Sequence, residues 1–374
     1  MTGSNKKCSV GNIRMRAELQ ICVADLQGNT FHMNYRLLGK SGLRVSELCL
    51  GTMTFGEEFG WGADREESHR IFDAFTAAGG NFIDTANYYN HGTSEIYVGE
   101  CIRSERDALV VASKYTLRRP GADPLDVNGG GNQRKNLRLS VESSLKRLGT
   151  DYLDLFYLHV WDWTTPAEEV LRGLDDLVRA GKVLHIGISD SPAWVASYLQ
   201  AIAELRGWSR LAAYQGEYSL RQRGVESDVL PMTRAMDMSM LAFGMLGGGV
   251  LTGKFNRAGG PGEATRAHEA TPQELTMAAA VLEVAQECGR SPSQVAINWV
   301  RQQSDNIIPV LGARKVSQLV DNLGALDFRL NPEQIERLSQ TNPRTPAYPH
   351  TFWGDWVQKM IFGEHAANLH GLQE

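Results

Sequence analysis

The chain has few cysteines, no long hydrophobic run and no excess of positive charge. Its five cysteines among 374 residues are widely spaced and form no CxxC pair, so neither a disulfide framework nor a zinc site is indicated. We therefore expect a reducing compartment, the cytoplasm. No stretch reaches the roughly 18 apolar residues of a membrane span. The net charge of −5 gives no reason to expect nucleic acid or an anionic membrane as a partner. A small molecule is the expected partner.

The composition divides the chain into three regions. In residues 1–32 charged side chains interrupt every apolar stretch, so we expect no apolar h-region of a signal peptide there, and we expect a disordered or dispensable extension. With 42% hydrophobic and 22% charged residues, the chain has the composition of an ordinary globular protein, which fits one large domain or two smaller ones. Residues 33–345 are expected to form one barrel, on the alternation described next. Residues 346–374 are expected to form a C-terminal extension of helix and loop that packs on the domain or at a subunit contact.

Short apolar runs alternate with amphipathic stretches along this domain. The runs are rich in Val, Ile and Leu, as buried parallel strands are, and lie at 48–51, 82–85, 109–114, 153–159, 183–189, 211–215, 240–243 and 307–311. The helical stretches include 66–78, 134–148, 166–180, 192–206, 274–288 and 292–303. Eight such alternations favour a closed (β/α)8 TIM barrel over an open sheet. Ahead of them, apolar segments on both sides of residues 40–42 predict an N-terminal β-hairpin.

Four reactive side chains lie at or near the ends of three consecutive predicted strands. Asp84, Lys114 and His159 follow apolar runs, and Tyr89 lies five residues after Asp84. Strands of a barrel lie about 4.8 Å apart and their C-terminal ends share one face, so we expect these groups to be neighbours. A buried ammonium is expected to lower the pKa of the phenol from about 10, and Asp84 is expected to keep Lys114 charged. Each residue alone is more often structural, but together they indicate a proton-donating site for carbonyl reduction.

These residues belong to longer motifs. Residues 81–89 (NFIDTANYY), with Ser113-Lys114 and Leu158-His159, resemble the aldo-keto reductase family, and the similarity extends over about residues 35–330. It includes residues 144–155 (SLKRLGTDYLDL), 187–189 (GIS) and 312–314 (GAR). More narrowly, residues 129–132 (GGGN), 159–162 (HVWD), 189–195 (SDSPAWV) and 231–234 (PMTR) resemble the aryl-alcohol dehydrogenase branch of that family.

The resemblance implies NADPH-dependent reduction of aldehydes or ketones, aryl aldehydes among them, to alcohols. Tyr89 would be the general acid, Lys114 and Asp84 would tune it, and His159 would orient the carbonyl. The implied cofactor is NADP(H), and no metal is implied. The substrate would be a small carbonyl compound or alcohol. Aromatic side chains are common in small-molecule pockets, so Trp61 and Trp161 are expected to line this one with Tyr89 and His159.

The resemblance also implies the cofactor contacts. Ser189, Asp190 and Gln215 would hold the nicotinamide carboxamide, and Phe243 would stack on its ring. The pyrophosphate would lie against the glycine-rich segment 244–249, near Lys254. Arg314, before a predicted helix that carries Gln318 and Asn322 on one face, would bind the 2′-phosphate at the helix N-terminus. The complete set of cofactor positions is Thr52, Met53, Asp84, Ser189, Asp190, Gln215, Phe243, Gly244, Met245, Leu246, Gly249, Lys254, Gly312, Arg314, Gln318, Asp321 and Asn322.

Asp190 departs from the family pattern, because many members have Asn at this position. If ionised, Asp190 is expected to favour the positively charged oxidised nicotinamide and so make bound NADPH a better hydride donor. Phe243 also departs from the pattern, because it stands where Tyr is commoner.

Two other classes of function fit the same residues. A regulatory subunit could keep the fold and bind NADPH with little turnover, as the potassium-channel β-subunits of this family suggest. A cofactor-free barrel could instead use Lys114 as a Schiff-base nucleophile.

Overall fold

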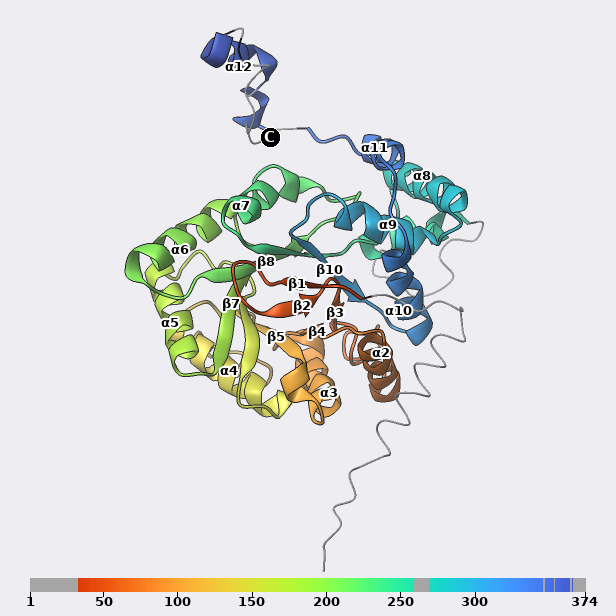
Figure 1. The fold of residues 1–374 in the computed structure, drawn as a ribbon. Helices are drawn as coiled ribbons and strands as arrows, with labels where there is room; N and C mark the ends of the chain where they lie inside the picture. Colours follow the sequence, from red (N-terminus) through yellow and green to blue (C-terminus); the bar gives the residue numbers. More distant parts are fainter. Residues whose placement is uncertain (1–32, 258–268, 346, 353, 364, 366–374) are drawn as a thin grey trace, which may run out of the picture.

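A closed barrel of eight parallel strands lies at the centre of the computed structural model, which describes residues 33–257, 269–345, 347–352, 354–363 and 365 (Figure 1). The strands are β3 Cys49–Gly51, β4 Phe82–Asp84, β5 Val110–Tyr115, β6 Leu153–Leu158, β7 Val183–Ser189, β8 Leu211–Glu217, β9 Ser239–Phe243 and β10 Ile307–Gly312. Consecutive strands pair, and β10 closes the barrel against β3. The predicted TIM barrel is confirmed. The predicted extension 1–32 lies outside the described residues.

Helices link the strands and surround the barrel (Figure 1). They are α2 Arg65–Ala77, α3 Thr93–Ile102, α4 Arg134–Leu148, α5 Ala167–Arg179, α6 Ala193–Arg206, α7 Val229–Ala235, α8 Pro272–Cys288, α9 Pro292–Arg301, α10 Val316–Leu323, α11 Pro332–Gln340 and α12 Asp355–Phe362. Local sequence sets several of their ends. The helices α8, α9 and α11 each begin with a capping box followed by proline, and α4, α6 and α8 each end at a left-handed glycine.

Alternate side chains of each strand fill the barrel interior, because successive residues of a strand face opposite sides of the sheet. This interior cluster contains Leu38, Val45, Cys49, Phe82, Val110, Ala112, Leu155, Tyr157, Ala212, Ala213, Leu241, Ile308 and Val310. Two of its members come from the predicted hairpin, formed by β1 Tyr35–Leu37 and β2 Arg44–Ser46. The hairpin lies across the N-terminal end of the barrel (Figure 1). The opposite, C-terminal end is therefore the end where a site can open.

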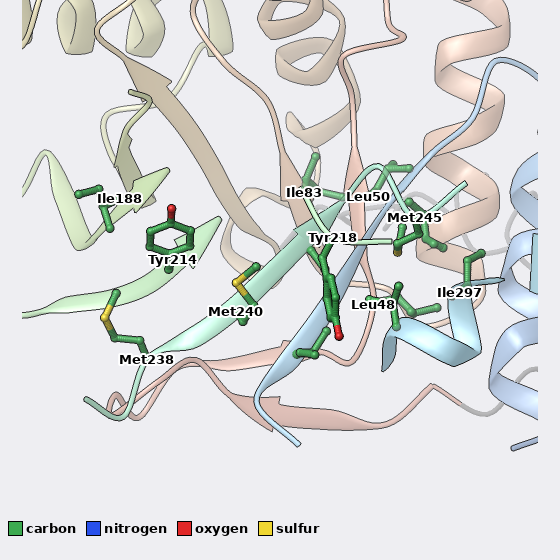
Figure 2. Close-up of a cluster of buried hydrophobic side chains, with 14 of the residues drawn as sticks. Leu48, Leu50, Ile83, Ile188, Tyr214, Tyr218, Met238, Met240, Met245 and Ile297 are labelled. Atoms are coloured by element: carbon green, nitrogen blue, oxygen red, sulfur yellow. The ribbon is translucent and has the colours of Figure 1, made fainter. Parts of the chain in front are cut away.

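The other strand residues point outward and pack against the helices. Figure 2 shows part of this outer core, where Leu48, Leu50 and Ile83 of the strand region lie near Met245 and Ile297. Burying this apolar surface stabilises the fold by roughly 25 cal/mol for each Å² removed from water. The outer core fixes the strands, and hence the direction in which their inward side chains point.

The C-terminal extension has few connections to the barrel among the described residues. Helix α12 stands apart from the barrel in Figure 1. One contact ahead of it joins His350 Nε2 to Asp228 Oδ1 at 3.0 Å. No described helix is long and apolar enough to cross a membrane.

Candidate active site

The inward-facing residues at the C-terminal ends of the strands line a cavity of about 410 Å³. Asp84 follows the inward Phe82 by two residues on β4, and Ser189, Gln215 and Phe243 line the cavity from the C-terminal parts of β7, β8 and β9. Strand register sets these residues side by side, since Ser189 pairs with Gln215. The cavity therefore collects polar groups from strands that are far apart in the sequence.

Lys114 holds the centre of the predicted catalytic group. Its Nζ donates hydrogen bonds to Asp84 Oδ2 at 2.5 Å, to the Thr85 carbonyl at 2.9 Å and to the Tyr89 hydroxyl at 3.0 Å. These three contacts use all three donors of the ammonium. The Lys114 side chain is fully buried, and the Asp84 side chain is 2% exposed. Asp84 is held in turn by Gln215, whose Nε2 donates to Asp84 Oδ1 at 3.0 Å.

The charges around Tyr89 only partly follow the prediction. Burial lowers the pKa of Lys114, but Asp84 and Tyr89 outweigh it and hold this pKa above its ordinary value. Burial raises the pKa of Tyr89 above 10, and the opposing effect of Lys114 does not cancel it. The expected net lowering of the Tyr89 pKa is therefore wrong, because desolvation of the phenolate is the larger effect. Tyr89 carries its proton at neutral pH.

His159 lines the same cavity as Tyr89. Its ring meets that of Tyr89 edge to face, with centroids 6.0 Å apart. Burial, aided by the positive charge of Lys114, lowers the pKa of His159 to about 3. The imidazole is therefore neutral, and its Nδ1 is buried with no hydrogen-bond partner among the described residues. A neutral imidazole can accept or donate a single hydrogen bond at each nitrogen, depending on its tautomer.

The polar end of the cavity at β7 and β8 suits an amide. The Ser189 hydroxyl is buried and has no hydrogen-bond partner in the described part of the chain. Asp190 follows with a positive φ of 38°, and its carboxyl lines the cavity. Asp190 is exposed to solvent, but desolvation by the surrounding protein atoms, opposed by Lys114 and reinforced by Glu217, raises its pKa to about 6. A carboxamide has both a donor and an acceptor, so it can form hydrogen bonds with the Ser189 hydroxyl and the Asp190 carboxyl group.

The glycine-rich segment after β9 forms a second wall. Gly244, Gly247, Gly248 and Gly249 all have positive φ values, which side chains rarely allow. The Lys254 amine lies close to Gly249, within 2.7 Å of where a Cβ would stand, and the φ of 97° at this position favours glycine. Backbone in such turns can approach an anion closely, and the nearby ammonium adds positive charge.

The far end of the cavity lies at α10. Gln318, Asp321 and Asn322 of this helix line it, together with Arg314, which precedes the helix. The first amide of α10, at Val316, already donates to a Glu67 carboxylate oxygen at 2.7 Å. The predicted anion site at this helix N-terminus therefore depends mainly on the Arg314 guanidinium, because a protein carboxylate occupies part of the N-terminus.

Three predicted site residues do not line the cavity: Thr52, Trp161 and the fully buried Lys114. Thr52 is fully buried, and its hydroxyl contacts the Asp84 carbonyl at 3.0 Å, while the preceding Gly51 takes the place on the cavity wall. Trp161 is buried in the outer core. Trp61 does line the cavity, as do residues that were not expected from the sequence, including Thr54, Ser293, Ile297 and Val310. No cluster of His, Cys, Asp or Glu within the described ranges could hold a metal ion.

Comparison with known proteins agrees with this geometry. The model for the Aldo/keto reductase family matches residues 47–343. The chain is 39% identical over 331 residues to norsolorinic acid reductase of Aspergillus flavus, which covers 85% of this chain and 83% of that protein. It is 38% identical over 334 residues to aryl-alcohol dehydrogenase (NADP(+)) of Phanerodontia chrysosporium, covering 84% of this chain and 87% of that protein.

The chain therefore belongs to the aldo/keto reductase family. It is an NADP-dependent oxidoreductase, and the predicted family and cofactor are confirmed. The described residues fit this cofactor at three points: an unsatisfied hydroxyl, a glycine cradle beside a lysine, and an arginine at the far end of one continuous cavity.

Proposed function

We propose that the chain reduces aldehydes or ketones to alcohols with NADPH and that Tyr89 donates the proton. The observation that carries this proposal is the 3.0 Å contact between Lys114 Nζ and the Tyr89 hydroxyl. The Tyr89 side chain itself lines the cavity. A positioned acid of this kind typically contributes a factor of about 10² to 10⁴ to the rate. When bound, the nicotinamide supplies the hydride that reaches the carbonyl carbon.

The proton passes from the Tyr89 hydroxyl to the carbonyl oxygen. Because the pKa of Tyr89 lies above 10, the hydroxyl keeps its proton until a strongly basic alkoxide oxygen develops. The phenolate left behind lies beside the Lys114 ammonium, which offsets its negative charge in a site of low dielectric. Asp84 keeps this ammonium charged and fixed. This arrangement favours reduction, since oxidation would require Tyr89 to lose its proton first.

His159 and the cofactor residues complete the proposal. The neutral imidazole of His159 orients the carbonyl oxygen toward Tyr89 without competing as a charged acid. Ser189, Asp190 and Gln215 hold the carboxamide, and Phe243 stacks on the ring. The glycine-rich segment with Lys254 holds the pyrophosphate. The 2′-phosphate is held by Arg314, and the other proposed cofactor positions are Met53, Asp84, Gly312, Gln318, Asp321 and Asn322.

Aromatic carbonyl compounds are the proposed substrate class. Two relatives are named for an aryl alcohol and for norsolorinic acid. On this chain, Trp61 lines the same cavity as Tyr89 and offers a flat apolar wall. An indole face of this kind favours stacking with another aromatic ring.

The test is NADPH consumption with a panel of aromatic and aliphatic aldehydes, ketones and alcohols. Stoichiometric oxidation of NADPH with formation of the alcohol supports the proposal. Saturable NADPH binding with negligible turnover on the whole panel, together with a stable protein partner, would favour a regulatory subunit instead. A Schiff base at Lys114 is disfavoured because its amine is buried, charged and fully hydrogen-bonded. Borohydride trapping of a carbonyl on Lys114 would reverse that judgement.

A further inference from the structure

One buried side chain, Asn90, fastens the loop after β3 to the turn that carries Tyr89. Its Nδ2 donates to the carbonyls of Met53 and Phe55, both at 3.0 Å, and its Oδ1 accepts from the Phe59 amide at 3.0 Å. The side chain is fully buried. Three hydrogen bonds to backbone therefore join two segments that lie more than thirty residues apart in the sequence.

The backbone of this turn is adapted to the contact. Asn90 has φ 44° and ψ 48°, and the next residue, His91, also has a positive φ. Asn is one of the few residues that adopt this left-handed region readily. Opposite it, a Cβ at Gly56 would lie 2.8 Å from the Asn90 Cβ, so only glycine fits there. Both loops are shaped so that the Asn90 side chain fits between them.

The loop that Asn90 holds, residues 53–59, is followed by Trp61, which lines the cavity. The Phe59 ring, whose backbone amide Asn90 holds, contacts the Trp61 ring at a centroid distance of 6.1 Å. The same Phe59 ring contacts Tyr88 at 6.1 Å and His91 at 5.5 Å. Asn90 is therefore linked to Trp61, on the cavity wall, through the backbone and the ring of Phe59.

We propose that Asn90 is a positioning residue that fixes the Trp61 ring relative to the Tyr89 hydroxyl and thereby selects aromatic over aliphatic carbonyl substrates. The inference rests on the proposed function, because it concerns the substrate of the same site. An aromatic ring gains from Trp61 only when the indole is held at a stacking distance while the carbonyl reaches Tyr89. An aliphatic aldehyde has no ring to stack, so its turnover depends less on where Trp61 lies.

The test compares Asn90→Gly with the wild type on benzaldehyde and butanal with NADPH. Glycine keeps the left-handed backbone but removes the three hydrogen bonds. We expect the ratio of kcat/KM for benzaldehyde over butanal to fall by about twofold to tenfold, the range for one aromatic contact. The dissociation constant of NADPH should change less than the ratio does, since the proposed phosphate and carboxamide contacts lie on other loops and only Met53 of the proposed cofactor positions is held by Asn90. Asp237→Gly is the matched control, because Asp237 is also left-handed but precedes β9 at the opposite end of the barrel.

Two further variants keep the inference falsifiable if Asn90→Gly does not fold. Asn90→Asp keeps the acceptor for Phe59 but sets a buried carboxylate oxygen against the carbonyls of Met53 and Phe55, so it should lower the same ratio at least as far as Asn90→Gly. Trp61→Ala should reproduce the loss, and combining it with the Asn90 variant should lower the ratio no further. An unchanged ratio in a folded Asn90 variant, or an equal fall for both aldehydes, overturns the inference. If the wild type reduces neither aldehyde, the proposed function fails instead.

Discussion

The buried pair of Lys114 and Asp84 should cost far more to break than an ion pair on the surface. In Asp84→Asn the ammonium keeps hydrogen-bond acceptors but loses its countercharge inside a site where Lys114 is fully buried. Removing one partner of a buried pair typically costs about 3–5 kcal/mol of folding free energy. Asp176→Asn is the control, because Asp176 is 34% exposed and pairs with Arg134 and Arg172, which are 54% and 43% exposed. That change should cost about 0–1 kcal/mol.

The loss of folding free energy in Asp84→Asn should also depend on pH. In the wild type the pKa of Lys114 is raised, so the pair stabilises the fold at neutral pH and this stability is lost only as the pH rises through that pKa. In Asp84→Asn the main raising partner is gone and burial lowers the pKa of Lys114. The unfolded chain then binds more protons than the folded one, so the deficit should shrink as pH rises, by up to about 1.4 kcal/mol per pH unit.

Urea unfolding of the cofactor-free protein at pH 7 and at about pH 9.5 measures both effects. The double variant Asp84→Asn with Lys114→Met should recover much of the loss, since it leaves no buried charge. The reasoning is refuted if Asp84→Asn costs no more than Asp176→Asn, or if its deficit is the same at both pH values.

Two further predictions concern the cofactor. Arg314→Ala should weaken NADPH binding by about tenfold or more and leave NADH binding nearly unchanged, because only NADPH carries the 2′-phosphate; titration of both cofactors checks this. A retained preference for NADPH would show that another group binds the phosphate. Asp190 ionises as the pH rises through about 6, so NADP⁺ binding should tighten over that range while NADPH binding does not, and Asp190→Asn should remove the difference. An unchanged ratio of the two dissociation constants in the variant would count against this role.

Much of the barrel could be predicted from the sequence because its strands are buried on both faces. Such strands appear as short continuous apolar runs, and each predicted run lies within two residues of the observed strand. The proximity of Asp84, Lys114 and Tyr89 could be predicted because the strand ends of a barrel share one face. Helix α3 was not predicted, because its buried face includes the polar Ser94 and Glu95, which weakens the apolar periodicity.

Other features depend on details that only the folded chain supplies. Thr52 and Gly51 are neighbours in sequence, but a strand residue and its neighbour face opposite sides, so Gly51 lines the cavity and Thr52 does not. The sign of the Tyr89 pKa shift depends on how deeply the phenol is buried as well as on Lys114. Asn90 has no motif of its own, and its role became visible only through its contacts with Met53 and Phe59.

The proton donor is tested most directly by a single turnover of Tyr89→Phe with saturating NADPH and an aromatic aldehyde. The account predicts that the wild type converts bound NADPH and aldehyde to NADP⁺ and alcohol. The variant should bind NADPH with nearly the same affinity and react about 10² to 10⁴ times more slowly. A variant that reduces the aldehyde at the wild-type rate would contradict the account, because the proton would then come from another group.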